Sequence, residues 1–165
     1  MKKTIVLLVA ILLLFSVAGC NTTEVEDPKS EVASFVGYMV IKDNILHFDE
    51  VEIVEWEDQE RVKELDLDLQ NDMPSGYAII NENQEERIYV LADEVDYTFA
   101  DINLNFIKES EGDRIYTTTK LREFLQHLGE YNLNEVPLSE QTIPYFIKIQ
   151  DGKVISIEEK LKYTI

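Results

Sequence analysis

Alternating apolar and polar residues run through most of the chain from residue 34 onward, a period typical of strands with one buried face. Residues 34–41 are rich in β-formers and alternate. The sequence Lys-Asp-Asn at 42–44 then supplies a turn into a second strand that begins at Ile45. The residues from 34 to about 50 therefore predict a strand, a tight turn and a second strand.

The apolar face of that second strand changes partway along it. Leu46 and Phe48 occupy even-numbered positions, whereas Val51 and Ile53 occupy odd-numbered positions. Neighbouring residues of a strand point to opposite faces, so a continuous strand cannot bury both pairs on the same side. We therefore expect a bulge or bend near residues 49–50.

Two segments have helical rather than strand periodicity. The first covers about residues 57–69 and the second about residues 120–128, where Thr118 or Thr119 supplies a cap and Gly129 an end. The apolar positions of the two helices are Val62, Leu65 and Leu69, and Leu121, Phe124, Leu125 and Leu128. Stripes of this kind indicate helices that pack against a core.

Two hairpins are expected in the rest of the chain. The first joins a strand at 77–80 to one at 87–91. The second turns at Asp151-Gly152, a pair that favours a type I′ turn because both central residues need positive φ. Apolar residues continue at alternate positions of its second strand as far as Ile165, which predicts a long last strand.

Together these elements predict an α+β fold in a single domain over residues 34–165. It has about seven short strands in a curved antiparallel sheet and two helices. An open barrel of the OB type is one specific version of this fold.

The N-terminus has the pattern of an export signal: Lys2 and Lys3, an apolar run, and small residues up to Gly19. The apolar run is shorter than the roughly 20 residues that a spanning helix needs, although an uncleaved anchor helix is the alternative reading. We expect a signal peptide over residues 1–19.

The sequence Val17-Ala18-Gly19-Cys20 is similar to the lipobox of bacterial lipoproteins. The resemblance implies that a peptidase cuts before Cys20 and that acyl chains on Cys20 anchor the chain to the membrane. Residues 20–33 then form the lipidated cysteine and a polar, flexible tether. The lipobox and this acidic tether look like those of small Gram-positive lipoproteins, a class that implies no particular activity.

Charge and composition exclude several functions. The chain has 33 acidic and 15 basic residues and a net charge of -18, which disfavours nucleic acid as a partner. Its single cysteine excludes an internal disulfide or a cysteine zinc site. The two histidines, His47 and His127, have no metal-ligand spacing, and we expect both to lie at the surface or its boundary. No cofactor motif is present.

Three weaker candidates remain. Asp66, Asp68 and Asp72 alternate like the start of a calcium loop, but Asn71 and Tyr77 stand where an EF-hand needs glycine and glutamate. Trp56, among acids, is able to bind a cation or sugar, but packing over the first helix is the preferred interpretation. A carboxylate-dependent hydrolase of wall polymer needs two facing acids, and 33 acids allow too many pairs to choose among.

The sequence thus predicts a lipid-anchored, extracytoplasmic module that acts by binding and not as an enzyme. Its partner is expected to be another envelope protein or a small ligand. Weak calcium binding and wall-polymer hydrolysis are the alternatives.

Overall fold

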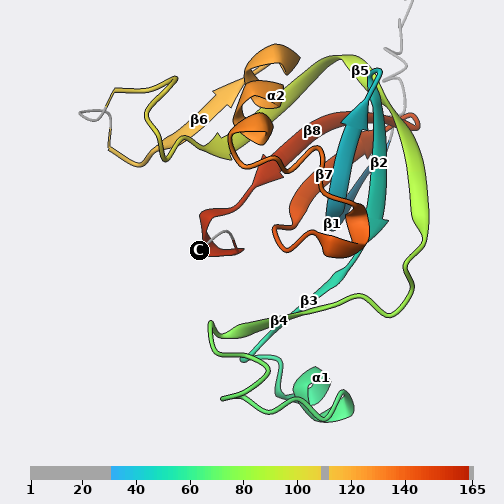
Figure 1. Ribbon diagram of the computed structural model, residues 1–165. Helices are drawn as coiled ribbons and strands as arrows, with labels where there is room; N and C mark the ends of the chain where they lie inside the picture. Colours follow the sequence, from blue (N-terminus) through green and yellow to red (C-terminus); the bar gives the residue numbers. More distant parts are fainter. Residues whose placement is uncertain (1–30, 109–111, 164–165) are drawn as a thin grey trace, which may run out of the picture.

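Five strands close into a barrel (Figure 1). The computed structural model describes residues 31–108 and 112–163. In chain order the barrel strands are β1 (Val32–Lys42), β2 (Ile45–Glu50), β5 (Glu86–Ala100), β7 (Tyr145–Gln150) and β8 (Lys153–Glu159). β1 pairs with β2, β2 with β5, β5 with β8, β8 with β7, and β7 with β1, so the circuit is complete.

This circuit has the topology of an OB-like barrel. The β5–β8 pair is parallel and the other four pairs are antiparallel. A parallel pair requires a long crossover, which here contains β6 (Ile115–Thr118), α2 (Leu121–Glu130), the short helix η2 (Leu138–Glu140) and β7. The predicted α+β class and its OB-like version are confirmed, and the parallel pair is the departure from a wholly antiparallel sheet.

Two tight turns fix the registers of the hairpins. Asp43 and Asn44 have φ values of 51° and 62°, and Asp151 and Gly152 have values of 51° and 75°. Two consecutive positive φ values are the requirement of a type I′ turn, whose twist matches that of the flanking strands. Both turns join strands that the sequence analysis placed correctly.

Gly37 marks the point where β1 changes partners. The residue pairs with Tyr145 of β7 on one side and with Glu50 of β2 on the other. A Cβ at this position would lie 2.2 Å from the backbone oxygen of Asp49, so the two strands approach too closely for any side chain. The glycine therefore permits the sharp coil that closes the barrel.

A smaller unit extends from one end of the barrel (Figure 1). It consists of β3 (Glu52–Glu55), α1 (Gln59–Glu64) and β4 (Tyr77–Ile80), and β3 pairs only with β4. Its own core contains Val54, Val62, Met73 and Ala78. The parity change after Phe48 thus marks the place where the chain leaves the barrel for a second sheet.

Three expectations about these elements were wrong in detail. The strand at 77–80 pairs with β3 and not with 87–91, because β5 pairs with β2 instead. The first helix ends at Glu64 and not near residue 69, since Asp66 has a φ of 53° that no helix continues through. The last strand ends at Glu159 and is followed by a 3-10 helix, η3 (Leu161–Tyr163).

Helix α2 closes the barrel core as its apolar stripe predicted. Phe124 and Leu128 are buried and belong to the main core cluster, and Leu121 and Leu125 pack against it. Thr118 precedes the helix, and its hydroxyl accepts a hydrogen bond from the Lys120 amide and donates one to Glu123. Within the described residues, no helix is long and apolar enough to cross a bilayer.

Candidate functional site

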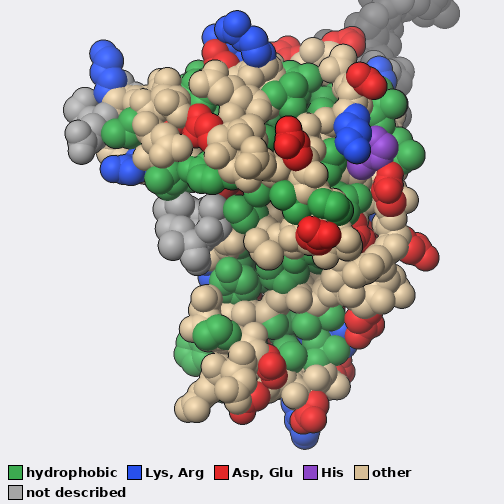
Figure 2. All heavy atoms as spheres, viewed as in Figure 1, with side chains coloured by type: hydrophobic (Ala, Val, Ile, Leu, Met, Phe, Trp, Pro, Cys, Tyr) green, Lys and Arg blue, Asp and Glu red, His purple; other side chains and the backbone are tan. Residues whose placement is uncertain are grey.

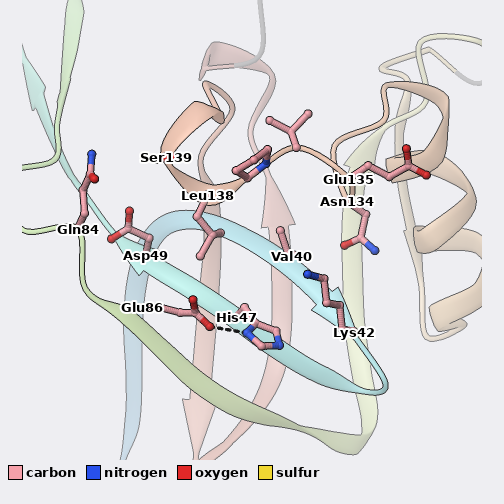
Figure 3. Close-up of a pocket in the computed structure, with 12 residues that line it drawn as sticks. Val40, Lys42, His47, Asp49, Gln84, Glu86, Asn134, Glu135, Leu138 and Ser139 are labelled. Atoms are coloured by element: carbon pink, nitrogen blue, oxygen red, sulfur yellow. Dashed lines mark hydrogen bonds and ion pairs between the residues drawn. The ribbon is translucent and has the colours of Figure 1, made fainter.

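A groove of about 470 Å³ lies on the outer face of β1 and β2 (Figure 3). Its floor consists of Val40 and Lys42 from β1 and of His47 and Asp49 from β2. Residues 134–139, which connect α2 to β7, form one wall, and Gln84 and Glu86 form the other. The groove is therefore assembled from four parts of the chain that are far apart in sequence.

The strand period explains why these floor residues face outward. Leu46 and Phe48 are fully buried in the barrel, so the alternate residues of β2, His47 and Asp49, point to the outside. In β1 the same alternation buries Met39 and leaves Val40 on the outer face. Val40 is nevertheless only 5% exposed, because the wall covers it.

Two side-chain amides hold this wall against β1. Gln141 accepts a hydrogen bond from the Met39 amide at 3.1 Å and donates one to the Met39 carbonyl at 2.8 Å. Asn134 makes the same pair of bonds with Ile41, at 2.7 and 2.8 Å. Strand β7 stops pairing with β1 at Gly37, so the amides satisfy backbone groups that would otherwise lack partners. We call Asn134 and Gln141 the amide clasp.

Asp49 is a buried polar residue of the groove, and one of its two carboxylate oxygens has no hydrogen-bond partner. It is only 3% exposed, and its Oδ2 accepts one hydrogen bond from the Asn81 side chain at 2.8 Å. Its Oδ1 is buried and has no hydrogen-bond partner, and the Oδ1 of Asn81 also has none. Burial, and after it the Asp49 carboxylate, raises the pKa of Tyr38, the residue opposite on β1. A buried carboxylate with one neutral donor is costly unless something else pairs with it.

The rest of the groove contains a paired histidine and an unpaired lysine. His47 Nδ1 lies 2.5 Å from Glu86 Oε1, and their side chains are 26% and 51% exposed (Figure 3). Lys42 has no ion-pair or hydrogen-bond partner for its amine within residues 31–108 and 112–163. His47 thus lies at the surface boundary, as the sequence predicted, whereas its pairing with Glu86 was not foreseen.

An exposed apolar strip continues from the groove along β5. Ile88 lies opposite His47 and Val90 lies opposite Ile45, so they share its outer face. Ile88 and Val90 are 62% and 53% exposed, among the most exposed large apolar side chains of the described chain. The outside of β2 and β5 therefore offers both polar and apolar contacts.

The structure also joins His127 to Glu159, a contact that sequence reasoning missed. The His127 Nε2 atom lies 2.8 Å from Glu159 Oε2, and the two side chains are 3% and 2% exposed. The imidazole stacks on Phe99 with ring centroids 4.2 Å apart. The expectation of a surface or boundary histidine is wrong for His127. Because the pair is enclosed between α2 and the end of β8, we interpret it as part of the core.

The calcium candidates Asp66, Asp68 and Asp72 lie in the exposed loop after α1. Asp68 Oδ1 accepts hydrogen bonds from the amides of Gln70 and Asn71, and Asp72 Oδ2 accepts one from the Asp68 amide. Their carboxylates thus shape their own loop. Within the described ranges, no group of three or more His, Cys, Asp or Glu side chains is arranged to hold a metal ion.

The two remaining candidates have different outcomes. Trp56 is 53% exposed, so about half of its surface is open to solvent, and its packing over the first helix stays a prediction. Its neighbours on β3 include Glu55, which is held by Lys162 and Tyr163. Hydrogen bonds from those two groups lower the pKa of Glu55. Cys20, the predicted lipidation site, lies outside the described residues.

Comparison with known proteins adds no family to this picture. No protein-family model, curated protein or solved structure matches the chain. The OB-like class therefore rests on strand order and register alone, and function has to be argued from the groove.

Proposed function

We propose that this protein is a lipid-anchored binding module at the outer face of the cytoplasmic membrane, and that the groove is its binding site. The observation that carries the proposal is that Asp49, one of the residues lining the groove, is buried and has an Oδ1 without a hydrogen-bond partner. A buried acceptor without a partner requires an explanation, and we assign it to a group of the bound ligand. Its ligand is another envelope protein or a small molecule.

The barrel type supports the position of this site. In OB barrels the outer face of the second and third barrel strands binds ligands, and here those strands are β2 and β5. Fold alone does not define function, so this support is an analogy. The independent support is that the groove, the Asp49 oxygen and the exposed Ile88 and Val90 all lie on or beside that face.

The N-terminal sequence supports the proposed location at the membrane. The lipobox-like Val17-Ala18-Gly19-Cys20 places acyl chains on Cys20, and two or more chains are enough for stable anchoring. On the face that Figure 2 shows, acidic side chains are spread over both the barrel and the smaller unit, whereas Lys and Arg occupy fewer places. An anionic membrane repels such a surface, so we expect the barrel to stand away from the bilayer with its groove accessible.

The proposal predicts that a cross-linker in the groove captures a partner in intact cells. A photoreactive amino acid at Ser139, an exposed residue of the groove wall, should form an adduct that intact-mass analysis or a shifted band detects. The matched control is the same amino acid at Lys148, an exposed position on the outer face of β7. We expect at least about fivefold more adduct at Ser139, because binding there is specific.

The same experiment in a Cys20→Ala background tests the anchor. Cys20→Ala removes the acylated thiol and with it the site before which the peptidase cuts, so the variant should keep residues 1–19 and have no lipid mass. The original chain should begin at Cys20 and have the added mass of its acyl chains. Equal adducts at Ser139 and Lys148 would contradict the binding site. An original chain that keeps residues 1–19, or that has no acyl mass, would contradict the anchor.

A further inference from the structure

We propose that the groove binds a short, extended peptide with a free amino end. In this arrangement the terminal ammonium group bonds Asp49 and the terminal carboxylate bonds Lys42. This inference rests on the proposed function, since it names the ligand class of the same groove.

The carboxylate at one end of the groove matches an ammonium group. Asp49 lines the groove, and its Oδ1 is a buried acceptor without a donor. Its Oδ2 already accepts a hydrogen bond from Asn81, which is not one of the lining residues. A primary ammonium group carries three donors and a positive charge. It is thus able to donate to Asp49 Oδ1 and to neutralise the carboxylate, which a neutral donor such as a hydroxyl does not.

A metal ion is a poorer occupant of this end. Hard cations need several oxygen ligands around them. Asp49 supplies one free oxygen, and the described residues contain no group of three potential ligands at this place. Glu86, the acid opposite Asp49 on β5, already contacts His47. An organic ammonium ion therefore fits this carboxylate better than a metal ion does.

The other end of the groove offers a positive charge. Lys42 lies opposite Ile45, and Asp49 is four residues further along β2, so their backbone positions are about 14 Å apart. Figure 3 shows Lys42 and Asp49 at opposite ends of the floor, with Val40 and His47 between them. An extended chain of about four residues spans this length. The length of the floor between Lys42 and Asp49 therefore suits a peptide of about four residues, with one terminus beside each side chain.

The middle of the groove suits small side chains. Val40 forms the floor there, and Val136 and Leu138 belong to the facing wall. Exposed Ser139 and Gln84 lie at the rims and supply polar groups for the peptide backbone. The volume of about 470 Å³ is typical of sites for small ligands. A ligand of only negative charge is disfavoured, because Asp49, Glu86 and Glu135 all line the groove.

Tetraalanine is the probe for this inference. The full chain, purified in detergent, is titrated by calorimetry with tetraalanine, with N-acetyl-tetraalanine and with tetraalanine amide. Acetylation removes the ammonium group and should weaken binding about tenfold or more, and amidation removes the carboxylate and should weaken it about threefold.

Two variants assign each terminus to its residue. Asp49→Asn should weaken tetraalanine binding as much as acetylation does, and acetylation should then have no further effect. Lys42→Met should behave in the same way toward amidation. Asp96→Asn and Lys153→Met remove exposed charges outside the groove and should leave the affinity unchanged. Equal affinities for tetraalanine and its acetylated form, or full affinity in Asp49→Asn, would overturn the inference.

The outcome also separates this inference from the proposed function. If tetraalanine does not bind while the Ser139 cross-link persists, the groove binds something else and the peptide inference is wrong. If neither is observed, both the inference and the proposed function are wrong.

Discussion

Replacing His127 with leucine is expected to lower the free energy of unfolding by about 3–5 kcal/mol. The change leaves Glu159 as a buried carboxylate whose remaining donor is the Ala100 amide, at 3.3 Å. Removing one partner of a buried hydrogen-bonded pair is expensive because the other polar group stays out of water without compensation. Domains of this size have only about 5–15 kcal/mol of stability, so the loss is a large share. Urea unfolding of the full chain in detergent measures it.

The matched control is the other histidine–glutamate pair of the chain. His47 and Glu86 make the same contact at the surface, where an ion pair contributes about 0–1 kcal/mol, so His47→Leu should have little effect. The double variant His127→Leu/Glu159→Leu should recover most of the lost stability, because an apolar pair replaces both buried polar side chains. A loss below about 1 kcal/mol for His127→Leu would contradict the role assigned to the buried pair.

Replacing Gln141 with leucine is expected to cost about 3 kcal/mol. The side chain is 6% exposed, and it bonds both the amide and the carbonyl of Met39 and also the carbonyls of Leu133 and Val136. Leucine has a similar size but leaves these backbone groups buried and unpaired, and each such group costs about 1–3 kcal/mol. The measurement is again the free energy of unfolding from urea titration.

The control for this substitution is Gln70→Leu. Gln70 is an exposed glutamine, and its replacement should change stability by no more than about 0.5 kcal/mol. The loss at Gln141 should also loosen the wall of the groove, since the amide clasp joins residues 134–141 to β1. A stability equal to that of the original chain would show that the clasp does not hold β1.

The hairpins and α2 could be predicted because their signals are local. Asp43-Asn44 and Asp151-Gly152 carry the positive φ values of their turns within two residues. The stripe of α2 repeats at helical spacing within one segment. Strand partners are different, since alternation shows which face of a strand is buried but not which strand lies beside it. For this reason the pairing of β4 with β3 was missed.

The sequence contains a signal from which the buried contact of His127 with Glu159 could have been predicted. His127 is three residues after Phe124, within the apolar stripe of α2, and Glu159 continues the inward parity of Ile157 on β8. Two ionisable residues at core positions of different elements are expected to meet, because neither is stable there alone. We expected His127 at the surface or its boundary, so its contact with Glu159 was not predicted.

Asp49 could not be found in this way. Its parity places it on the outer face of β2, where a carboxylate normally faces water. It is buried because Asn81, at the end of the smaller unit, and the start of β5 lie over it. The insertion of that unit between β2 and β5 is a property of the tertiary structure, and no local pattern reveals it.

The proposed site requires that Asp49 is present for binding and not for folding. The free energy of unfolding of Asp49→Asn tests this claim without any knowledge of the ligand. We expect it to equal that of the original chain or to exceed it by about 1 kcal/mol, because the variant removes a buried charge that has one hydrogen bond. A loss of about 2 kcal/mol or more would make Asp49 a structural residue and would contradict the proposed site.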